Sequence, residues 1–380
     1  MDKILHITNW YPNRWNQNEA GFIKEHFDAC KKYVEQELWH VQVRNEGALF
    51  RLYLGDYSEN EHYIVLDTRV RIWRLQEILT FLLLVILRVK LGKKWWDVAD
   101  VHIAYPLLRF TKIFRYLFGR SVVITEHWSA YRNNFFLPYM NKAAKRIAKI
   151  FSYEIPVIAV SRALMGDIVQ FAGHDNFPQH IIPNVVDPAT FYPEIHARNN
   201  ALIFLMVASW APIKRPFLVM KAFVELLHDL PEAKLRIVGS GAQFSEMREF
   251  VLDNRLENSI ELLGAMDKAG IGREMRQADC FLHASEYETF SVVCAEALSC
   301  GLPVIASNVG GIPEFVNSKN GILVENTHED WISALRKFVD YGIKFEREEI
   351  VLRNKEKFDP YVIGKKLEHI YELSIMGLSE

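Results

Sequence analysis

Two carboxylates eight positions apart, Glu288 and Glu296, have the residue types and the surroundings needed to bind a polar ligand. The apolar stretch 279–284 predicts a buried parallel strand, and residues 297–301 predict a helix end capped by Gly301. We therefore expect Glu288 in a strand-to-helix loop and Glu296 inside the helix, more than one turn from its start. Two glutamates at this spacing are more often a coincidence or part of a solvated surface. The interpretation as a binding site therefore depends on the predicted strand, loop and helix that surround them.

That loop is expected at the carboxyl end of the strands of an open α/β sheet, where such sheets bind ligands. The N-terminus of the following helix offers free N–H groups, which suit an anionic group such as a diphosphate. One acid can then reach a sugar beside the anion, while the other reaches hydroxyls further along the ligand. The stretch from Glu288 to Glu296 is thus a candidate site for a nucleotide sugar.

Lys214 follows a predicted strand by a short loop and precedes Pro216, which suits the first position of a helix. An ammonium group at this edge can neutralise a leaving diphosphate, although Lys214 is also compatible with a surface lysine before a helix. Gly239-x-Gly241 follows another strand and lets the backbone approach a ligand. It does not complete the GxGxxG pattern of dinucleotide-binding proteins.

Residues 285–304, with Gly310-Gly311-Ile312-Pro313-Glu314, resemble the retaining glycosyltransferases of family 4, which have the GT-B fold and an E-x7-E signature. The ordered set of similar motifs covers nearly the whole chain. Its other members are Ile4–Ile7 with Tyr11-Pro12 and Gly21-Phe22, Thr125-Glu126-His127, Val160-Ser161, Ile182–Asp187 with Phe191, Lys214 and Val238–Gly241.

On the donor side, the resemblance implies that Glu296 hydrogen-bonds the nucleotide ribose and that Glu288 binds the transferred sugar. Backbone N–H groups around Thr289, Phe290 and Ser291 would face sugar and phosphate, and Gly239 and Lys214 would lie in the donor domain. The family usually has Gly where Thr289 and Ser291 stand, and commonly Arg where Ser209 stands. Either Lys214 carries the positive charge alone or Arg215 compensates.

On the acceptor side, the resemblance places Gly21 in a glycine loop and His127 at the cleft edge of the first sheet, as a sugar-contacting catalytic residue. A satisfied core histidine is the usual alternative for a lone His after a buried strand. Glu126 and Trp128 beside it are candidates for acceptor recognition.

The composition fits a globular protein of two domains: 380 residues, 50% hydrophobic and 24% charged. Residues 1–190 hold 24 Lys and Arg against 19 Asp and Glu, whereas residues 191–380 hold 21 against 28. The basic first half favours an anionic membrane surface or a phosphorylated acceptor over nucleic acid. The four cysteines lack CxxC pairing, which indicates free thiols in a reducing compartment.

Apolar strands alternate with helices, which predicts two doubly wound, Rossmann-like parallel sheets. The resemblance implies that these sheets face a cleft, as in GT-B. We expect an acceptor-side domain over 1–190, a donor domain over 191–357 and a helix over 358–380 that, by the resemblance, returns to the first domain. The polar stretch 188–200 is the expected linker. Strands are expected at Ile4–Thr8, Val101–Tyr105, Val122–Thr125, Pro156–Val160, His180–Pro183, Ala201–Ala208, Lys234–Val238, Ile260–Leu263, Cys280–Ala284, Pro303–Ala306 and Ile322–Val324. The helices of the second domain are expected to begin near Pro216, Gln243, Lys268, Ser291 and Ile312.

The apolar run 78–87 is too short to span a bilayer and predicts a buried or interfacial helix. Two basic amphipathic stretches, 109–118 and 142–149, fit either a solvated helix face or contact with a membrane surface. Met1-Asp2-Lys3 leads straight into a strand, which leaves no room for a signal peptide. We expect a cytoplasmic protein that is peripheral on the cytoplasmic face of the membrane.

These features predict a hexosyltransferase-type enzyme that moves a sugar from a nucleotide-diphosphate donor to a glycan or lipid-linked acceptor in cell-surface polysaccharide synthesis. The resemblance implies retention of configuration. No Asp-x-Asp and no metal-ligand spacing of His or Cys occurs, so we expect neither metal nor other cofactor. A GT-B epimerase or phosphorylase, or a non-catalytic GT-B scaffold that binds a membrane partner, are the alternatives.

Overall fold

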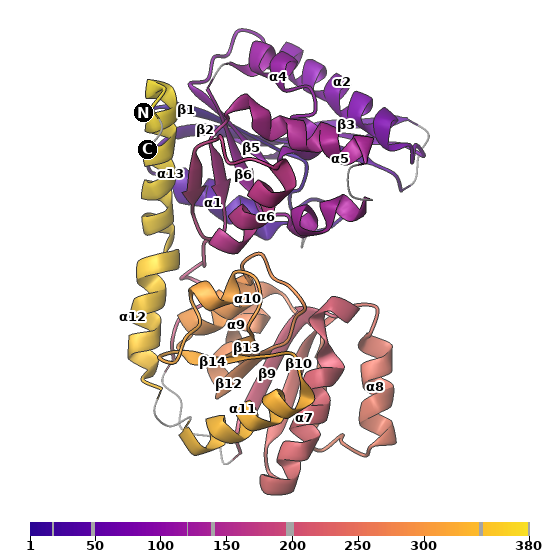
Figure 1. Ribbon diagram of the computed structural model, residues 1–380, viewed down its shortest axis with the longest axis vertical. Coiled ribbons are helices and arrows are strands. Elements are labelled where there is room, and N and C mark those ends of the chain that lie inside the picture. The colour runs from indigo at the N-terminus through magenta and orange to yellow at the C-terminus, as the bar shows by residue number, and fades with distance from the viewer. Residues whose placement is uncertain are drawn as a thin grey trace. The chain divides into compact units, whose positions relative to one another are not determined.

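The computed structural model describes residues 1–16, 19–46, 50–119, 121–137, 141–194, 201–341 and 345–378. The chain forms two compact units, shown in Figure 1. Unit 1 comprises Met1–Val185 and Pro360–Glu380, and unit 2 comprises Val186–Asp359. The domain boundaries expected at 190/191 and 357/358 lie five and two residues from these divisions.

Unit 1 is built on an eight-stranded sheet in the order β3-β4-β2-β1-β5-β6-β7-β8. Neighbouring strands are parallel except for the antiparallel pair β3–β4. The chain starts at a central strand, moves to one side and then crosses to the other, which is the winding of a Rossmann-like sheet. The strands are β1 (Lys3–Thr8), β2 (Glu35–Arg44), β3 (Arg51–Ser58), β4 (Glu61–Asp67), β5 (Val98–His102), β6 (Val122–Glu126), β7 (Val157–Ala159) and β8 (Gln179–Ile181).

The helices of unit 1 cover both faces of this sheet. Right-handed crossovers place α1 on one face and α2, α4, α5 and α6 on the other, because the chain moves across the sheet in opposite directions. Helix α13 packs against α1. The helices are α1 (Gly21–Cys30), α2 (Trp73–Leu91), α3 (Ala104–Leu107), α4 (Thr111–Phe118), α5 (Lys142–Ala148), α6 (Arg162–Ala172) and α13 (Pro360–Met376), with 3-10 segments η1 (Ser129–Phe136) and η2 (Lys149–Tyr153).

Helix α13 is an integral part of the core of unit 1. Its side chains Ile363, Leu367 and Ile370 pack with apolar residues of the sheet and of α1. Tyr371 is fully buried and donates a hydrogen bond of 2.7 Å from its hydroxyl to Asp100 Oδ2 in β5. The predicted return of the final helix to the first domain is confirmed.

Unit 2 contains a six-stranded, wholly parallel sheet in the order β11-β10-β9-β12-β13-β14. Strand β9 is central, and the winding direction reverses between β9 and β12, which makes their carboxyl ends the topological switch point where such sheets bind ligands. The strands are β9 (Ile203–Ser209), β10 (Lys234–Ser240), β11 (Ile260–Gly264), β12 (Cys280–His283), β13 (Val304–Ser307) and β14 (Gly321–Val324).

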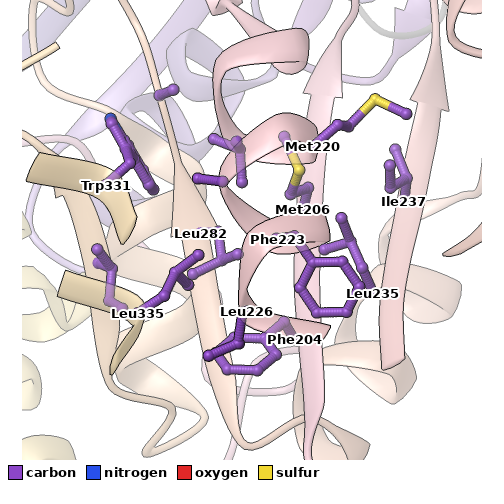
Figure 2. Packing of buried hydrophobic residues seen from close by; sticks show 14 of the residues in the cluster. Phe204, Met206, Met220, Phe223, Leu226, Leu235, Ile237, Leu282, Trp331 and Leu335 are labelled. Atoms are coloured by element: carbon purple, nitrogen blue, oxygen red, sulfur yellow. The ribbon is translucent and has the colours of Figure 1, made fainter. Parts of the chain in front are cut away.

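The helices of unit 2 bury apolar faces against this sheet. Figure 2 shows Met220, Phe223 and Leu226 of α7 against Phe204 of β9, with Leu335 of α11 in the same cluster. This packing fixes the start of α7 at the carboxyl edge of the sheet. The helices are α7 (Pro216–Asp229), α8 (Phe244–Asp253), α9 (Lys268–Gln277), α10 (Val292–Ser299), α11 (His328–Tyr341) and α12 (Arg347–Phe358), with 3-10 segments η3 (Pro212–Lys214) and η4 (Ile312–Glu314).

Several local predictions differ from the structure. The strand expected at 101–105 is β5, Val98–His102, and the helix expected from Ile312 is the three-residue η4. Strand β2 was not predicted, because polar residues such as Gln36 and Glu37 break its apolar pattern; both are buried and hydrogen-bonded within unit 1. Residues 51–67, for which the sequence predicted no element, form the antiparallel hairpin β3–β4.

The first part of the linker expected at 188–200 does not lie between the two units. Residues 188–194 belong to unit 2, where Arg276 Nη1 donates a hydrogen bond of 3.0 Å to Thr190 O. Residues 195–200 of the predicted linker lie outside the described residues. None of the helices in the described parts of the chain combines the length and the apolar character needed to cross a membrane.

Candidate functional site

The loops that follow β9 and β12 bring Lys214 and Glu288 together at the switch point of unit 2. Strand β9 ends at Ser209 and β12 at His283, and the two strands are neighbours in the sheet. Lys214 Nζ forms a hydrogen-bonded ion pair with Glu288 Oε1, although 74 positions separate the residues. The two residues placed in the donor site by their motifs are therefore direct partners.

His283 completes this cluster and was not singled out in the sequence. Its Nε2 lies 2.8 Å from Glu288 Oε1, and its side chain is 4% exposed. The available signal was its position: a polar residue at the carboxyl end of an otherwise apolar strand, five residues before the loop glutamate. Lys214, Glu288 and His283 form the donor-edge cluster of unit 2.

The donor-edge cluster keeps Glu288 ionised. Burial raises the pKa of Glu288, but the Lys214 ammonium, and after it the hydrogen bond from His283, outweigh burial and bring the pKa down to about 2. A carboxylate in this state is a strong hydrogen-bond acceptor for hydroxyl groups of a ligand. Lys214 is already paired with this carboxylate, so a diphosphate bound here would share the ammonium group with Glu288.

Arg215 supplies the second cation at this edge. Its backbone is left-handed, with φ 44°, at the turn that starts α7. Its guanidinium has no hydrogen-bond or ion-pair partner within the described ranges of the chain. Ser209, where the resembled family commonly has Arg, is the exposed last residue of β9. Compensation by Arg215 for the arginine that is missing at Ser209 stays a prediction. The guanidinium charge of Arg215, which is unpaired among the described residues and lies next to Lys214 in the chain, favours it.

A glycine loop after β13 holds the backbone of Glu288. Gly311 N donates a hydrogen bond of 3.0 Å to Glu288 O. Gly310 has φ +53°, and a Cβ placed on it would lie 1.8 Å from the same carbonyl oxygen. Only glycine allows this approach, so the Gly310-Gly311 pair that belonged to the motif positions Glu288.

The residues between Glu288 and α10 are fixed by their side chains. Phe290 is buried, with its ring centroid 5.0 Å from that of Phe315 and 5.2 Å from that of Phe358. Ser291 is the N-cap residue of α10 and has φ 76°, a conformation that glycine adopts more readily. The side chain of Phe290 thus packs inside unit 2, which leaves the backbone at Thr289, Phe290 and Ser291 for the predicted contacts.

Glu296 lies in the second turn of α10 and is 5% exposed. Asn354 of α12 anchors this helix by donating a hydrogen bond of 2.9 Å from Nδ2 to Ala295 O. Contact between Glu296 and a ribose stays a prediction, as does ligand contact by Gly239. For Gly239 the structure gives a packing reason: its φ is +127°, and a Cβ would lie 1.9 Å from Ala208 O.

On the acceptor side, Gly21 is the first residue of α1, and His127 follows β6 at the carboxyl edge of the unit 1 sheet. His127 is buried, its Nδ1 lies 3.1 Å from Asn184 Oδ1, and its ring centroid is 4.6 Å from that of Phe22. Burial keeps the pKa of His127 well below 6.5, so the ring is neutral. Its Nε2 is buried without a partner among the described residues and can bind a ligand hydroxyl.

Glu126 is fully buried and forms hydrogen bonds with other residues of unit 1. Its Oε1 accepts a hydrogen bond of 2.7 Å from Ala104 N and another from the hydroxyl of Tyr131. Burial raises its pKa to about 7, despite these hydrogen bonds, which lower it. Direct contact between Glu126 and an acceptor stays a prediction. The structure shows that Glu126 links the end of β6 to α3 and η1 through these two hydrogen bonds.

A second buried group, His6 with Asp100 and His102, gathers atoms of the kind that bind metals in unit 1. The three potential ligand atoms lie within 4.8 Å of one another. His6 Nδ1 lies 3.1 Å from His102 Nε2, and Asp100 accepts hydrogen bonds from Thr125 and Tyr371. No sequence pattern indicated this group, because His6 of β1 lies 96 positions from His102 of β5 in the chain.

Unit 1 also has a pocket of about 210 Å³ at the carboxyl edge of its sheet. Its wall combines aromatic rings with polar groups, and Asn9 Oδ1 and Gln42 Oε1 are buried without a partner in the described chain. Such a wall suits a sugar or cyclitol, which stacks on rings and donates hydroxyl hydrogens. Sequence reasoning identified only Trp128 among the lining residues, which are Asn9, Trp10, Val41, Gln42, Val43, Trp73, Gln76, Glu77, Thr80, Tyr105, Pro106 and Trp128.

Comparison with solved structures identifies the fold as GT-B, the class of two-unit glycosyltransferases. Anabaena Alr3699/HepE in complex with UDP and glucose matches with a TM-score of 0.74 and 16% identity over 98% of this chain and 100% of that chain. The galactosyltransferase WaaB of the lipopolysaccharide outer core matches with a TM-score of 0.73 and 15% identity, covering 99% of both chains. At these identities the likeness concerns the fold alone.

Residues 190–356, which lie within unit 2, match the family model of glycosyl transferases group 1. This match confirms, for that segment, the resemblance to family 4 of the retaining glycosyltransferases that the E-x7-E motif indicated.

Curated relatives share part of their length with this chain. One subunit of the phosphatidylinositol N-acetylglucosaminyltransferase of Arabidopsis thaliana is 23% identical over 262 residues, 68% of this chain and 57% of the relative. A D-inositol 3-phosphate glycosyltransferase of Kineococcus radiotolerans is 28% identical over 212 residues, 48% of this chain and 49% of the relative. The chain thus spans about half the length of these two relatives.

Proposed function

We propose that this protein is a retaining glycosyltransferase that moves a hexose-type sugar from a nucleotide diphosphate to a hydroxyl of a glycan or lipid-linked acceptor. The observation that carries the proposal is the donor-edge cluster. It combines an ionised glutamate, a lysine and a histidine at the switch point of unit 2, inside the segment that matches the family.

In the proposed reaction, Glu288 accepts hydrogen bonds from hydroxyls of the transferred sugar, and its low pKa keeps it ionised throughout. Arg215 and Lys214 neutralise the diphosphate as the glycosidic bond breaks, aided by the N-terminus of α10. Glu296 binds the ribose. The departing diphosphate takes the proton of the acceptor hydroxyl on the same face of the sugar, so no protein nucleophile is required.

On the acceptor side, His127 Nε2 and the aromatic pocket of unit 1 hold the hydroxyl-bearing group. The relatives named for phosphatidylinositol and for D-inositol 3-phosphate both act on an inositol, and the solved WaaB acts in lipopolysaccharide assembly. These names support a polyhydroxyl acceptor, free or lipid-linked. The proposal includes cell-surface polysaccharide or glycolipid synthesis at the cytoplasmic face of the membrane.

The test is a screen of UDP-, GDP- and ADP-sugars for thermal stabilisation and slow hydrolysis, in excess EDTA. UDP-sugars come first, because Alr3699/HepE was solved with UDP-glucose. We expect stabilisation and hydrolysis without added metal, because the donor edge offers cations rather than a carboxylate cluster for the diphosphate. Activity that requires Mg²⁺ or Mn²⁺ contradicts this mechanism, and failure of all donors to bind supports the scaffold alternative.

An epimerase or phosphorylase is separated by its products. NMR of the product anomer distinguishes a retained glycosidic bond in a new glycoside from an epimerised nucleotide sugar. Strict dependence on inorganic phosphate as co-substrate would identify a phosphorylase and overturn the transferase proposal.

A further inference from the structure

Helix α2 exposes an apolar stripe along most of its length. Four side chains at intervals of four, four and three residues face solvent: Ile78 is 46% exposed, Leu82 49%, Ile86 38% and Val89 76%. At 100° per residue these four lie within about 80° of one another around the helix axis. The opposite side, including Leu79, Leu83 and Leu87, is buried against the sheet. A surface helix normally presents polar residues where this stripe lies, so an apolar contact is expected there.

Cations border this stripe, and exposed acids are absent from it. Arg74 and Arg88 of α2, and Lys112 and Arg115 of α4, have no ion-pair partner in the part of the chain that the structure describes. The only acidic residue in the sequences of α2, α4 and α5 is Glu77. It is 6% exposed and bound by Tyr105 and Arg109.

The neighbouring helices extend the same surface. Helices α2 and α4 are in contact, and Phe81 of α2 packs on Phe110 just before α4, with ring centroids 5.1 Å apart. Figure 1 shows the two helices side by side in unit 1. Helix α4 exposes Ile113 at 44% and Tyr116 at 87%. Within the basic stretch at 109–118, Arg109 forms an ion pair with Glu77, while Lys112 and Arg115 have no ion-pair partner among the described residues.

We define the α2–α4 face as the exposed apolar residues of these two helices with the four unpaired cations around them. We propose that the α2–α4 face docks on the surface of an anionic lipid bilayer, with α2 lying in the plane of the headgroups. Apolar side chains then enter the boundary of the acyl chains, and the cations meet lipid phosphates. This inference rests on the proposed function for its purpose, the supply of a lipid-linked acceptor, but not for its physical argument.

Charge complementarity favours a bilayer over a second copy of the chain. A symmetric contact would bring Arg74, Arg88, Lys112 and Arg115 against the same cations of the partner copy, with no exposed acid in α2 or α4 to balance them. An anionic bilayer offers negative charge and apolar depth in one continuous surface. The acyl region of a bilayer forms no hydrogen bonds, which suits the stripe because its side chains have no polar atoms.

The position of α2 links this surface to the acceptor pocket. Its first turns supply Trp73, Gln76, Glu77 and Thr80 to the wall of the 210 Å³ pocket. One side of the same helix therefore meets the bilayer, and its N-terminal end meets the pocket.

The experiment is co-sedimentation of the full chain with phosphatidylcholine vesicles and with vesicles that also contain phosphatidylglycerol. Wild-type protein is expected to bind the anionic vesicles, more weakly at high salt, and to bind pure phosphatidylcholine little. The double variant Leu82→Ser/Ile86→Ser is expected to lose about ten-fold or more in affinity. Lys112→Glu/Arg115→Glu is expected to lose at least about five-fold for each cation.

The matched controls change equally exposed residues of unit 2. Leu252→Ser/Leu352→Ser, at sites 53% and 60% exposed, is expected to bind vesicles like the wild type. Wild-type affinity in the two α2–α4 variants overturns the proposal. So does a change from dimer to monomer in Leu82→Ser/Ile86→Ser by light scattering, because the stripe would then be an interface between copies.

Donor binding without vesicles, measured by calorimetry, keeps the two proposals apart. Vesicle binding by a chain that binds no nucleotide sugar supports docking and refutes the transferase. Donor binding with no affinity for anionic vesicles refutes docking and leaves the transferase intact.

Discussion

Lys214 is expected to have two roles: it neutralises a diphosphate, and it keeps Glu288 ionised. One substitution tests both, because the first role affects the rate at pH 8 and the second affects the pH dependence. Lys214→Met removes the ammonium and retains most of the length of the side chain. Glu288 then keeps its burial, which raises its pKa, and loses the largest influence that lowers it. Its pKa should therefore rise above the wild-type value of about 2, to a level set by burial on one side and His283 on the other.

In the wild type, the lowering of this pKa from 4.5 to about 2 corresponds to about 3 kcal/mol, at about 1.4 kcal/mol per pKa unit. The sign follows from linkage. The pKa of Glu288 is lowered in the folded protein, so its pairing stabilises above pH 4.5 and this stability is lost as the pH falls towards 2. Wild-type turnover should show no acid limb from Glu288 between pH 4 and 8, whereas the acid limb of the variant should be shifted to higher pH by the raised pKa of Glu288.

The assay is single-turnover hydrolysis of the donor across this pH range, with Lys214→Arg as the control that keeps the charge. Loss of the diphosphate contact should lower kcat/KM of Lys214→Met by about ten- to hundred-fold at pH 8, from a charge-assisted hydrogen bond of about 1.5–3 kcal/mol. If turnover is too slow, the pH dependence of donor binding gives the same midpoint. A Lys214→Met profile that matches the wild type in rate and in acid limb refutes both roles and directs attention to Arg215.

Three further predictions concern the two glutamates, the glycine loop and the buried histidines. Glu296→Gln should weaken binding of the free nucleoside diphosphate, whereas Glu288→Gln should keep that affinity and slow turnover of bound donor; calorimetry beside single-turnover rates measures both, and the reverse pattern would show that the roles are exchanged. Gly310→Ala should lower turnover by displacing the carbonyl of Glu288, while Gly264→Ala, with a similar φ of +74° and open space around it, should reproduce only the backbone strain; equal rates in the two variants would contradict the positioning role. Burial lowers the pKa of His6 and of His102 to about 3, so protons bind the unfolded chain below pH 6.5 first, and stability should fall as the pH drops from about 6.5 to 3; urea unfolding at several pH values tests this, and constant stability would be inconsistent with two neutral buried rings.

The strands of unit 2 were predictable because central parallel strands are apolar runs bounded by turn residues. Stretches such as 280–284 have that pattern without interruption. Strand β2 escaped prediction because its polar residues are paired through tertiary contacts: Glu37 accepts hydrogen bonds from Trp39 and Lys94, and Gln36 contacts His6. A local pattern carries no information about such partners.

The same limit applies to the sites. The motif indicated Glu288 and Lys214 separately, but their ion pair depends on β9 lying next to β12, which the spacing of 74 residues does not reveal. The role of His283 depends on the path of the loop after β12, which folds back and brings the Glu288 carboxylate next to the His283 ring at the end of that strand. Arg109, which belongs to the basic stretch at 109–118, donates a hydrogen bond to the buried Glu77, a partner 32 positions away that the spacing does not indicate.

The nested path of the chain has a consequence for biosynthesis. Unit 2 is inserted into unit 1, and its two ends meet where Val186 N donates a hydrogen bond of 3.0 Å to Phe358 O. A ribosome therefore releases all of unit 2 before it releases α13, whose Tyr371 closes the core around Asp100. Unit 2 can therefore fold first, although most of unit 1 is synthesised before it. Unit 1 can complete its core only after α13 has left the exit tunnel.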